Sequence, residues 1–174
     1  NTGGIVIAAK NAETLRIINE KIRAHEVEKS YLCITVGRPK QPEGKIEGFL
    51  LKNEAKKEVR FFHKPVPGGK TAVTLYRTLE SRGGLSLVEC RLLTGRTHQI
   101  RVSMAEIGCP LLGDGKYGKG DVNRRYHETR QALYSYKLRF DFPTDAGLLN
   151  YLKGQEFTVE NVPFREKYFP EIPS

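Results

Sequence analysis

The sequence lacks several features that would place it in whole classes of protein. Its 174 residues include no tryptophan, three cysteines and one methionine. No run approaches the roughly 18 consecutive apolar residues of a membrane-spanning helix, and the first dozen residues lack the charged-then-apolar order of a secretory signal. These absences favour a soluble globular protein, and a chain of this length usually folds as one domain.

The cysteine and histidine content argues against disulfides and metal sites. Cys33, Cys90 and Cys109 are odd in number, far apart and each inside an apolar run, which favours free thiols in a reducing compartment. The four histidines are widely spaced, and neither a CxxC nor an HExxH motif occurs. We therefore expect a cytoplasmic protein without a bound metal.

The single methionine bears on where the protein begins. Because Met104 is the only methionine, Asn1 is not a translation start. We therefore expect further residues to precede Asn1 in the protein from which this chain comes.

The charge is strongly one-sided, with 29 Lys and Arg against 20 Asp and Glu and a net charge of +9. Such a surplus favours a polyanionic partner, either nucleic acid or an acidic membrane surface. The alternative is a solvated basic surface with no specific ligand. A membrane surface has little support, because no predicted helix is basic on one face and strongly apolar on the other.

The apolar pattern predicts an α+β domain dominated by antiparallel strands. Strands are expected at 5–9, 31–36, 71–79, 85–93, 132–142 and 157–159. The first of these is expected to be buried on both faces. Residues 37–48 are rich in turn formers, and residues 52–70 are expected to form short strands and basic loops.

Two helices and a brief C-terminal helix complete the prediction. The first spans 12–25, with Asn11 as its N-cap and with Leu15, Ile18 and Ile22 on its apolar face. The second spans 97–107 and ends at Gly108. Residues 113–120 form a glycine-rich loop.

Two glycine-rich segments resemble nucleotide-binding motifs without their context. Residues 68–71 (GGKT) resemble the end of a phosphate-binding loop, but Lys64 stands where that motif needs glycine, and a strand follows instead of a helix. Residues 113–118 match GxGxxG, but a helix precedes them where the dinucleotide fingerprint needs a strand, and no helix is expected to follow. We expect no nucleotide cofactor.

The most unusual segment is residues 92–102, at a predicted junction of strand and helix. Polar side chains and free backbone N–H groups can face a common ligand there. The polar residues concerned are Thr94, Arg96, Thr97, His98, Gln99 and Arg101. Arg101 lies beside the apolar stripe, which predicts partial burial and a carboxylate or phosphate partner. The alternative is a surface arginine whose aliphatic stem lies on the protein.

The run TGRTHQIRVSMAEIGCPLLGDGKYG, residues 94–118, resembles the signature of the RluA-type RNA pseudouridine synthases. Two further pieces agree in order and spacing. Residues 29–31 (KSY) resemble the K-x-Y motif of that family, and residues 1–10 resemble the end of its H-R-L-D-x-x-T-S-G motif. The resemblance is strong over residues 1–118 and looser beyond. Ser103 stands where many members have histidine, and Gly3 replaces the serine of T-S-G.

The resemblance implies an isomerase that converts uridine to pseudouridine in RNA without metal or organic cofactor. Its fold would be a mixed, mainly antiparallel sheet with flanking helices and a central RNA-binding cleft. A uridine stacked in an RNA helix is out of reach, so the base must be flipped into a pocket. By motif, Tyr31 would pack against the base, and Arg101 would pair with the catalytic aspartate and keep it ionised.

That aspartate lies outside the chain. Aligning Thr2 with the threonine of the first motif puts it two residues before Asn1. Glu28 is close to Tyr31 in sequence but is expected on the opposite strand face. Hence the 174 residues alone are expected to be a catalytic domain without activity. The alternative is a non-catalytic RNA-binding module on the same fold.

RNA as partner would account for the charge, because Lys and Arg contacts to phosphate supply most sequence-independent affinity. We expect large-subunit ribosomal RNA, with tRNA as an alternative, and a monomeric protein whose RNA-selecting S4-type domain would precede Asn1. The expected RNA-binding residues are Arg96, Thr97, His98, Gln99, Lys116, Arg124 and Arg125, with basic residues of 52–70.

Overall fold

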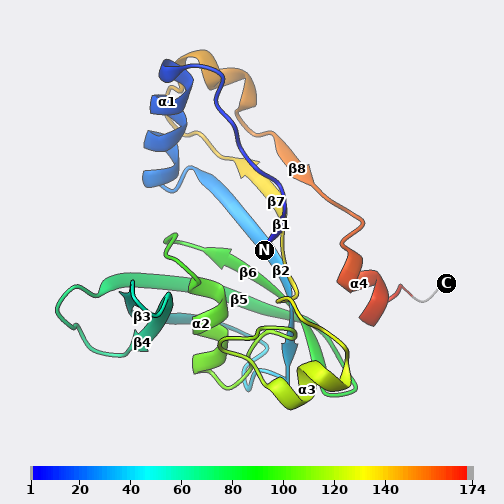
Figure 1. Cartoon of the computed structure of the whole chain (residues 1–174). Helices are drawn as coiled ribbons and strands as arrows, with labels where there is room; N and C mark the ends of the chain where they lie inside the picture. Colours follow the sequence, from blue (N-terminus) through cyan, green and yellow to red (C-terminus); the bar gives the residue numbers. More distant parts are fainter. Residues whose placement is uncertain (1, 172–174) are drawn as a thin grey trace.

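The computed structural model describes residues Thr2–Glu171 as an α+β fold (Figure 1). The strands are β1 (Gly3–Gly4), β2 (Val27–Val36), β3 (Glu43–Asn53), β4 (Glu58–Phe62), β5 (Lys70–Arg82), β6 (Leu85–Leu92), β7 (Leu133–Phe140) and β8 (Glu156–Thr158). The helices are α1 (Ala12–Arg23), α2 (Gln99–Glu106), α3 (Gly120–Arg125), α4 (Pro163–Tyr168) and the 3-10 helix η1 (Gly147–Leu152).

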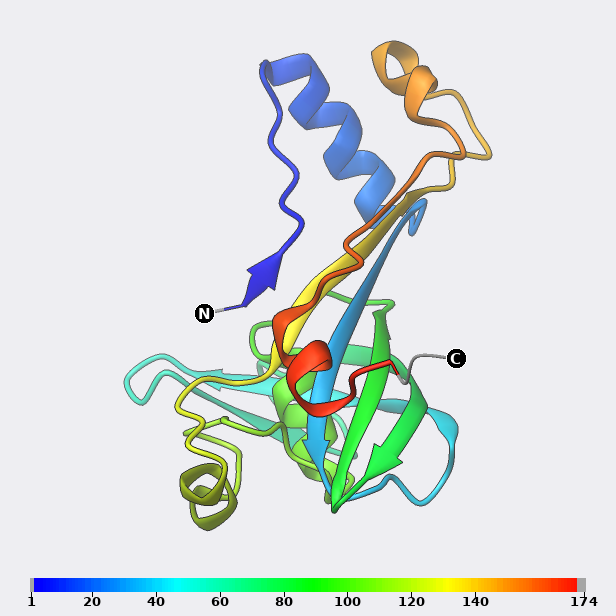
Figure 2. The ribbon, with the colours of Figure 1, turned by 90° about the vertical axis from the view of Figure 1, so that its right-hand side faces the viewer.

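All the strands belong to one sheet in the order β1-β7-β2-β6-β5-β3-β4, with β8 beside β7. Among the strands of Thr2–Glu171, β1 is the only one that pairs in parallel with a neighbour, β7. Strands β2 and β7 run side by side from the lower part of the sheet, as seen in Figure 2, up to the region that holds α1 and η1. The predicted fold class, a mainly antiparallel sheet with flanking helices, is confirmed.

The hairpin predicted between 71–79 and 85–93 is present as β5 and β6. Its turn uses Gly83 and Gly84, both with positive φ (59° and 80°), a conformation that side chains with a Cβ adopt with strain. The predicted strands at 31–36, 132–142 and 157–159 correspond to β2, β7 and β8. Within the turn-rich segment 37–48, however, β3 begins at Glu43, so the prediction of turns fails for its second half.

The prediction of a doubly buried strand at 5–9 is wrong. After β1, the chain is irregular to Lys10, and Val6 is 85% exposed. Ile5 and Ile7 pack against the core cluster beneath α1. The reason is that β7 pairs with the segment only at Gly3 and Gly4, apart from one hydrogen bond from the Ile5 N–H to Ser135 O at 2.9 Å.

Helix α1 forms where predicted, but its buried face differs from the expected stripe. The Asn11 side chain accepts from the Thr14 N–H at 2.9 Å, which confirms the N-cap. Of the expected stripe, Ile18 is buried and Ile22 packs against the same core cluster, whereas Leu15 is half exposed and Ile17 is buried instead. The rotation follows from η1, which packs beside α1 and covers Ile17.

Helix α2 ends as predicted, with Gly108 just beyond it at φ 82°. The Gly108 N–H bonds to Ala105 O at 3.0 Å, and the Cys109 N–H bonds to Met104 O at 3.0 Å, the two bonds of a Schellman motif. Helix α3 was not expected: six residues after the glycine-rich loop form a short helix. The expectation that no helix follows residues 113–118 is therefore wrong. The element immediately before them is a helix, α2, as expected, and not a strand.

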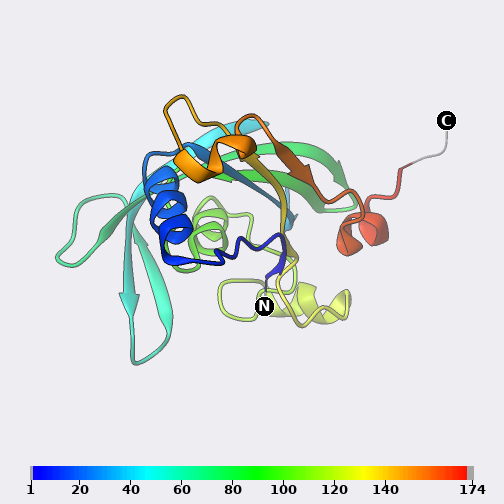
Figure 3. The ribbon, with the colours of Figure 1, turned by 90° about the horizontal axis from the view of Figure 1, so that it is seen from above.

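The core lies on both faces of β2, as its alternation predicts. Leu32, Ile34 and Val36 join one apolar cluster, and Cys33 joins another with Ile100 and Met104 of α2. All three cysteines are free and buried, which confirms the free thiols. Seen from above, α1 and α2 lie on the same side of the sheet (Figure 3), and this side carries the candidate site.

Candidate functional site

A pocket of about 360 Å³ brings together the three motifs of the sequence. We call it the Tyr31 pocket. Thr2 comes from the segment before β1, Tyr31 from β2, and Arg101 from α2. The other lining residues are Leu92, Arg96, His98, Gln99, Ile100, Gln131 and Leu133. The three motifs therefore meet at one place through Thr2, Tyr31 and Arg101, although they are far apart in sequence.

Tyr31 is aimed at the pocket by an irregularity in the sheet. Between Ser30 and Tyr31 the register of β2 on β7 shifts from Lys137 to Ser135, so that Tyr136 is an extra residue in β7. Such a bulge increases the local twist and redirects side chains. Burial raises the pKa of the Tyr31 hydroxyl, while a hydrogen bond with Ser135 acts in the opposite direction. The hydroxyl is therefore protonated at neutral pH.

Arg101 is held by a buried carboxylate that the sequence analysis did not assign. Its Nε donates to Asp114 Oδ2 and its Nη2 to Asp114 Oδ1, both at 2.8 Å. The Asp114 side chain is fully buried and that of Arg101 is 13% exposed. The Arg101 guanidinium also lies over the Tyr117 ring, 5.0 Å from its centroid. The predicted burial and anionic partner of Arg101 are thus present, with Asp114 as the partner.

The glycine-rich loop is folded around Asp114. Besides Arg101, the carboxylate accepts the backbone N–H groups of Lys116 at 2.9 Å and Tyr117 at 3.0 Å. Burial by itself would raise the pKa of Asp114, but the hydrogen bonds from Arg101 and from these N–H groups outweigh it and hold the pKa below its ordinary value. With four donors on a buried carboxylate, Asp114 is an ionised structural partner of Arg101, not an accessible nucleophile.

His98 begins α2 in a strained conformation, with φ 55°. Its Nδ1 and the Tyr117 hydroxyl are 2.8 Å apart, and that hydroxyl accepts the Val59 N–H of β4 at 2.8 Å. Burial, and then the charges of Arg101 and Lys116, lower the pKa of His98. The imidazole is therefore neutral at neutral pH.

Gln99 and Arg96 shape the loop before α2. The buried Gln99 amide accepts from the Thr94 hydroxyl and the Arg96 N–H and donates to Val73 O and the Thr74 hydroxyl, which uses its full hydrogen-bonding capacity. Arg96 Nε donates to Thr71 O at 2.8 Å. Gln99 therefore holds the loop, and Arg96 lies at the pocket edge.

The remaining predicted RNA-binding residues lie outside the Tyr31 pocket. Thr97 is exposed and lines a neighbouring pocket beside Lys52 and Lys70. The Lys116 ammonium bonds to Lys57 O, and so ties the loop to the hairpin of β3 and β4. Arg124 and Arg125 are exposed on α3 and line neither of these pockets.

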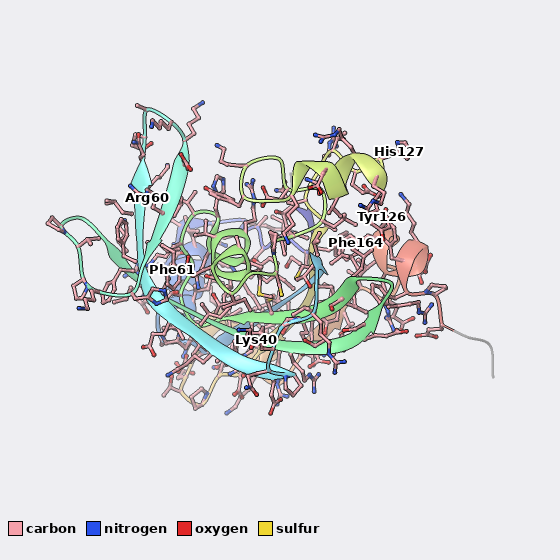
Figure 4. All side chains as sticks on the ribbon, turned by 90° about the horizontal axis from the view of Figure 1, so that it is seen from below. Lys40, Arg60, Phe61, Tyr126, His127 and Phe164 are labelled. Atoms are coloured by element: carbon pink, nitrogen blue, oxygen red, sulfur yellow. The ribbon has the colours of Figure 1, made fainter. Side chains whose placement is uncertain are left out.

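The basic residues predicted as one RNA surface lie at two sides of the molecule. Figure 4 shows Arg60 and Phe61 of β4 on one side, and Tyr126 and His127, which follow Arg125, on the other. Tyr126 packs edge-on against Tyr168 of α4, with ring centroids 5.8 Å apart. The hairpin and α3 therefore flank the molecule from opposite sides.

None of the residues that line the Tyr31 pocket is a carboxylate. Glu28 faces the other way, as predicted: its carboxylate lies 3.7 Å from Arg91 on β6. Among residues Thr2–Glu171, no group of three His, Cys, Asp or Glu side chains is placed to hold a metal ion, and no helix is long and apolar enough to cross a membrane.

Comparison with known proteins connects this geometry to a family. Residues 1–106, more than half of the chain, match the family described as RNA pseudouridylate synthase. The chain is 36% identical over 141 residues to ribosomal large subunit pseudouridine synthase D of Borreliella burgdorferi, covering 81% of this chain and 42% of that protein. It is 32% identical over 154 residues to ribosomal large subunit pseudouridine synthase C of Haemophilus influenzae, covering 87% and 48%. The chain thus spans less than half the length of these two relatives.

A solved structure agrees on the fold. Human RNA pseudouridylate synthase domain containing 4 superposes with a TM-score of 0.71 at 20% identity, covering 94% of this chain and 70% of that one. The match of residues 1–106 includes Thr2, Tyr31 and Arg101, which the fold brings to one pocket. On these grounds the chain belongs to the RluA-type RNA pseudouridine synthases.

Proposed function

We propose that the Tyr31 pocket receives a flipped uridine of large-subunit ribosomal RNA and is the place where it is isomerised to pseudouridine. The observation that carries the proposal is the meeting of Thr2, Tyr31 and Arg101, one from each motif, around a single pocket. The names of the two bacterial relatives support ribosomal RNA as substrate. Transfer RNA is the alternative.

The reaction breaks the bond between uracil N1 and the ribose and joins the ribose to uracil C5, so the base must turn while it is detached. A pocket lined by aromatic and polar side chains suits such a step, because it can hold the flipped base while it turns. Tyr31 would pack against the base, and its protonated hydroxyl can donate a hydrogen bond. Arg101, already fixed by Asp114, would present its remaining N–H groups to the nucleophilic aspartate expected two residues before Asn1.

We also propose that the 174 residues alone do not catalyse the reaction. The support is the absence of a carboxylate from the pocket lining, together with the buried and occupied state of Asp114. The same observation favours the second candidate, an RNA-binding module that lacks catalysis. The codons before Asn1 distinguish the two: an aspartate two residues upstream supports the enzyme, and any other residue there supports the module.

Further parts of the proposal concern the whole protein. We propose a cytoplasmic monomer, an S4-type domain before Asn1, and RNA contacts from Arg96, Thr97, His98, Lys116, Arg124 and Arg125. For Gln99 we propose an indirect part, through the loop that it holds.

The direct test is tritium release from RNA labelled at uracil C5, because isomerisation expels that hydrogen. The full-length gene product is assayed beside its Tyr31→Phe and Arg101→Gln variants, with Arg16→Gln as a control on the exposed face of α1. We expect release by the wild type and the control, and a loss of at least about 100-fold for both pocket variants, the size typical for removing an acid–base or electrostatic group.

A further inference from the structure

A second and larger hollow opens beside the Tyr31 pocket. It has a volume of about 720 Å³ and shares Tyr31, Leu92 and Arg96 with that pocket. We call it the basic groove. Its walls come from the end of α1, the turn after it, β2, and the connection from β6 to α2, which lies below the end of α1 in Figure 1.

Apart from Tyr31, the titratable side chains that line the basic groove are all basic, with no carboxylate among them. They are Arg23, His25, Lys29 and Arg96. Within Thr2–Glu171, none of the three permanent cations has an ion-pair partner. Elsewhere on α1 the pattern is the reverse, because Arg16 pairs with Glu20 and Lys21 with Glu26.

The local structure explains why these cations gather there. Lys29 lies two residues before Tyr31 on β2, so both side chains leave the same face of the strand. Arg23 is the last residue of α1, and His25 turns the chain into β2 in the left-handed conformation, at φ 58°. Arg96 is anchored through its Nε to Thr71 O, which leaves its other N–H groups as donors.

Unpaired cations above apolar walls create a field that attracts and orients a polyanion. The apolar walls here are Ile22, Val27, Leu92 and Leu93. A groove of one charge sign with walls of low dielectric constant concentrates that field. Phosphates contacted by lysine and arginine release counterions, and this release drives binding. If a base is held at Tyr31, the RNA strand that carries it lies at the mouth of this groove, because the two hollows share Tyr31 and Arg96.

We propose that the basic groove holds the sugar–phosphate backbone of single-stranded RNA adjoining the uridine, with Arg23, Lys29 and Arg96 as its phosphate contacts. The groove is thus the track by which the strand leaves the pocket, on the α1 side of the molecule and away from α3. This inference rests on the proposed function, because it takes the occupant of the Tyr31 pocket to be a nucleotide.

The test measures RNA affinity and its salt dependence, which need no catalysis. The 174-residue chain is titrated into a fluorescently labelled single-stranded RNA oligonucleotide with a central uridine, and anisotropy is followed between about 50 and 200 mM salt. In the double variant R23Q/K29Q we expect the slope of log affinity against log salt to become shallower by about 1.4, since each lost contact to a single strand removes about 0.7.

Two controls separate the groove from total charge and from folding. R16Q/K45Q also removes two positive charges, at exposed positions outside the groove (side chains 61% and 55% exposed), and should leave the slope nearly unchanged. R23K/K29R keeps the charges and should keep the slope. The proposal is overturned if R23Q/K29Q keeps the wild-type slope, or if R16Q/K45Q lowers it equally.

The outcome is independent of the activity assay. An altered slope in R23Q/K29Q, together with absence of tritium release from the full-length protein, would retain the groove as an RNA site and refute the isomerase. Tritium release from the full-length protein, with an unaltered slope in R23Q/K29Q, would support the isomerase and overturn the groove as an RNA site.

Discussion

At the residue scale, the site depends on Asp114, which fixes Arg101 in a buried ion pair. Two hydrogen bonds of 2.8 Å leave the guanidinium a single orientation, and the Tyr117 ring covers one of its faces. A buried arginine without a carboxylate would be an uncompensated charge. Asp114 is therefore a positioning residue for Arg101.

Replacing Asp114 should destabilise the fold as well as the site. In Asp114→Asn we expect the free energy of unfolding to fall by about 3–5 kcal/mol, because one partner of a buried pair is removed. Arg16→Gln, which breaks an exposed pair on α1, should cost no more than about 1 kcal/mol. Urea denaturation of both variants measures the difference, and equal costs would show that Asp114 contributes no more than a surface charge.

The same pair predicts a pH dependence. The pKa of Asp114 in the folded protein lies below its ordinary value of 3.8, so its stabilising contribution is present above that pH and is lost as the pH falls through the folded pKa. We expect the difference in unfolding free energy between wild type and Asp114→Asn to be constant near neutrality and to shrink on acidification below about pH 4. A difference that does not shrink would contradict an ionised Asp114.

Motif spacing predicted that Tyr31 and Arg101 belong to one site, because each lies within a short local pattern, and both line the Tyr31 pocket. The need of Arg101 for an anion was also predictable from its place beside the apolar stripe. The identity of its partner was not predictable, because only the folded conformation of the loop 113–118 brings Asp114 against α2. One signal was present: Asp114 lies within the run 94–118 that carries the resemblance.

At the scale of elements, the loop 113–118 joins α2 to the hairpin of β3 and β4. Asp114 holds Arg101 on one side, and Tyr117 bonds to Val59 of β4 on the other. The loop begins at Gly113, with φ 81°, where a Cβ would lie 1.9 Å from Arg130 O. The backbone of residue 130 thus leaves no room for a side chain at the start of the loop.

Alanine substitutions at two glycines with similar φ distinguish the cost of backbone strain from the cost of this steric clash. Gly108→Ala, with φ 82° and open space around a Cβ, should cost only about 1–2 kcal/mol, the strain of a left-handed alanine. Gly113→Ala adds the clash with Arg130 O and should cost clearly more, with loss of the Arg101–Asp114 pair. The denaturation midpoints of the two variants test this. An equal loss of stability would show that the loop shifts enough to accommodate the added Cβ.

The elements that sequence patterns predicted best are those whose pairing is local. The β5–β6 hairpin follows from its glycine turn, and α1 and α2 follow from their caps. The segment 5–9 was misjudged because an apolar run shows only that burial is favourable, not that a neighbouring strand is available on each side. β3 was partly missed because Gly44 and Gly48 hide its alternation. At both, a Cβ would meet a neighbouring aromatic ring, Tyr76 or Phe61, at 3.0 Å or less.

At the scale of the whole molecule, the charge of +9 divides into separate regions. Unpaired cations line the basic groove beside Tyr31, while the hairpin and α3 carry exposed basic residues at opposite sides. Net charge predicted a polyanionic partner, but the location of the cations depends on long-range pairing, which composition does not contain.

The contribution of α3 can be measured separately from that of the groove. If Arg124 and Arg125 contact flanking RNA, R124Q/R125Q should make the salt slope of binding shallower by up to about 1.4. The same anisotropy titration measures it. An unchanged affinity and slope would remove α3 from the proposed RNA-binding surface.

The central claim is that the pocket formed by Thr2, Tyr31 and Arg101 isomerises uridine when an aspartate joins it. Tritium release from RNA labelled at uracil C5 tests it most directly, with the full-length gene product compared with a protein of verified mass that starts at Asn1. The account predicts release by the full-length protein, loss of release in Tyr31→Phe and Arg101→Gln, and none from the shorter protein. Turnover by the protein that starts at Asn1, or by the full-length protein without Tyr31 and Arg101, would contradict it.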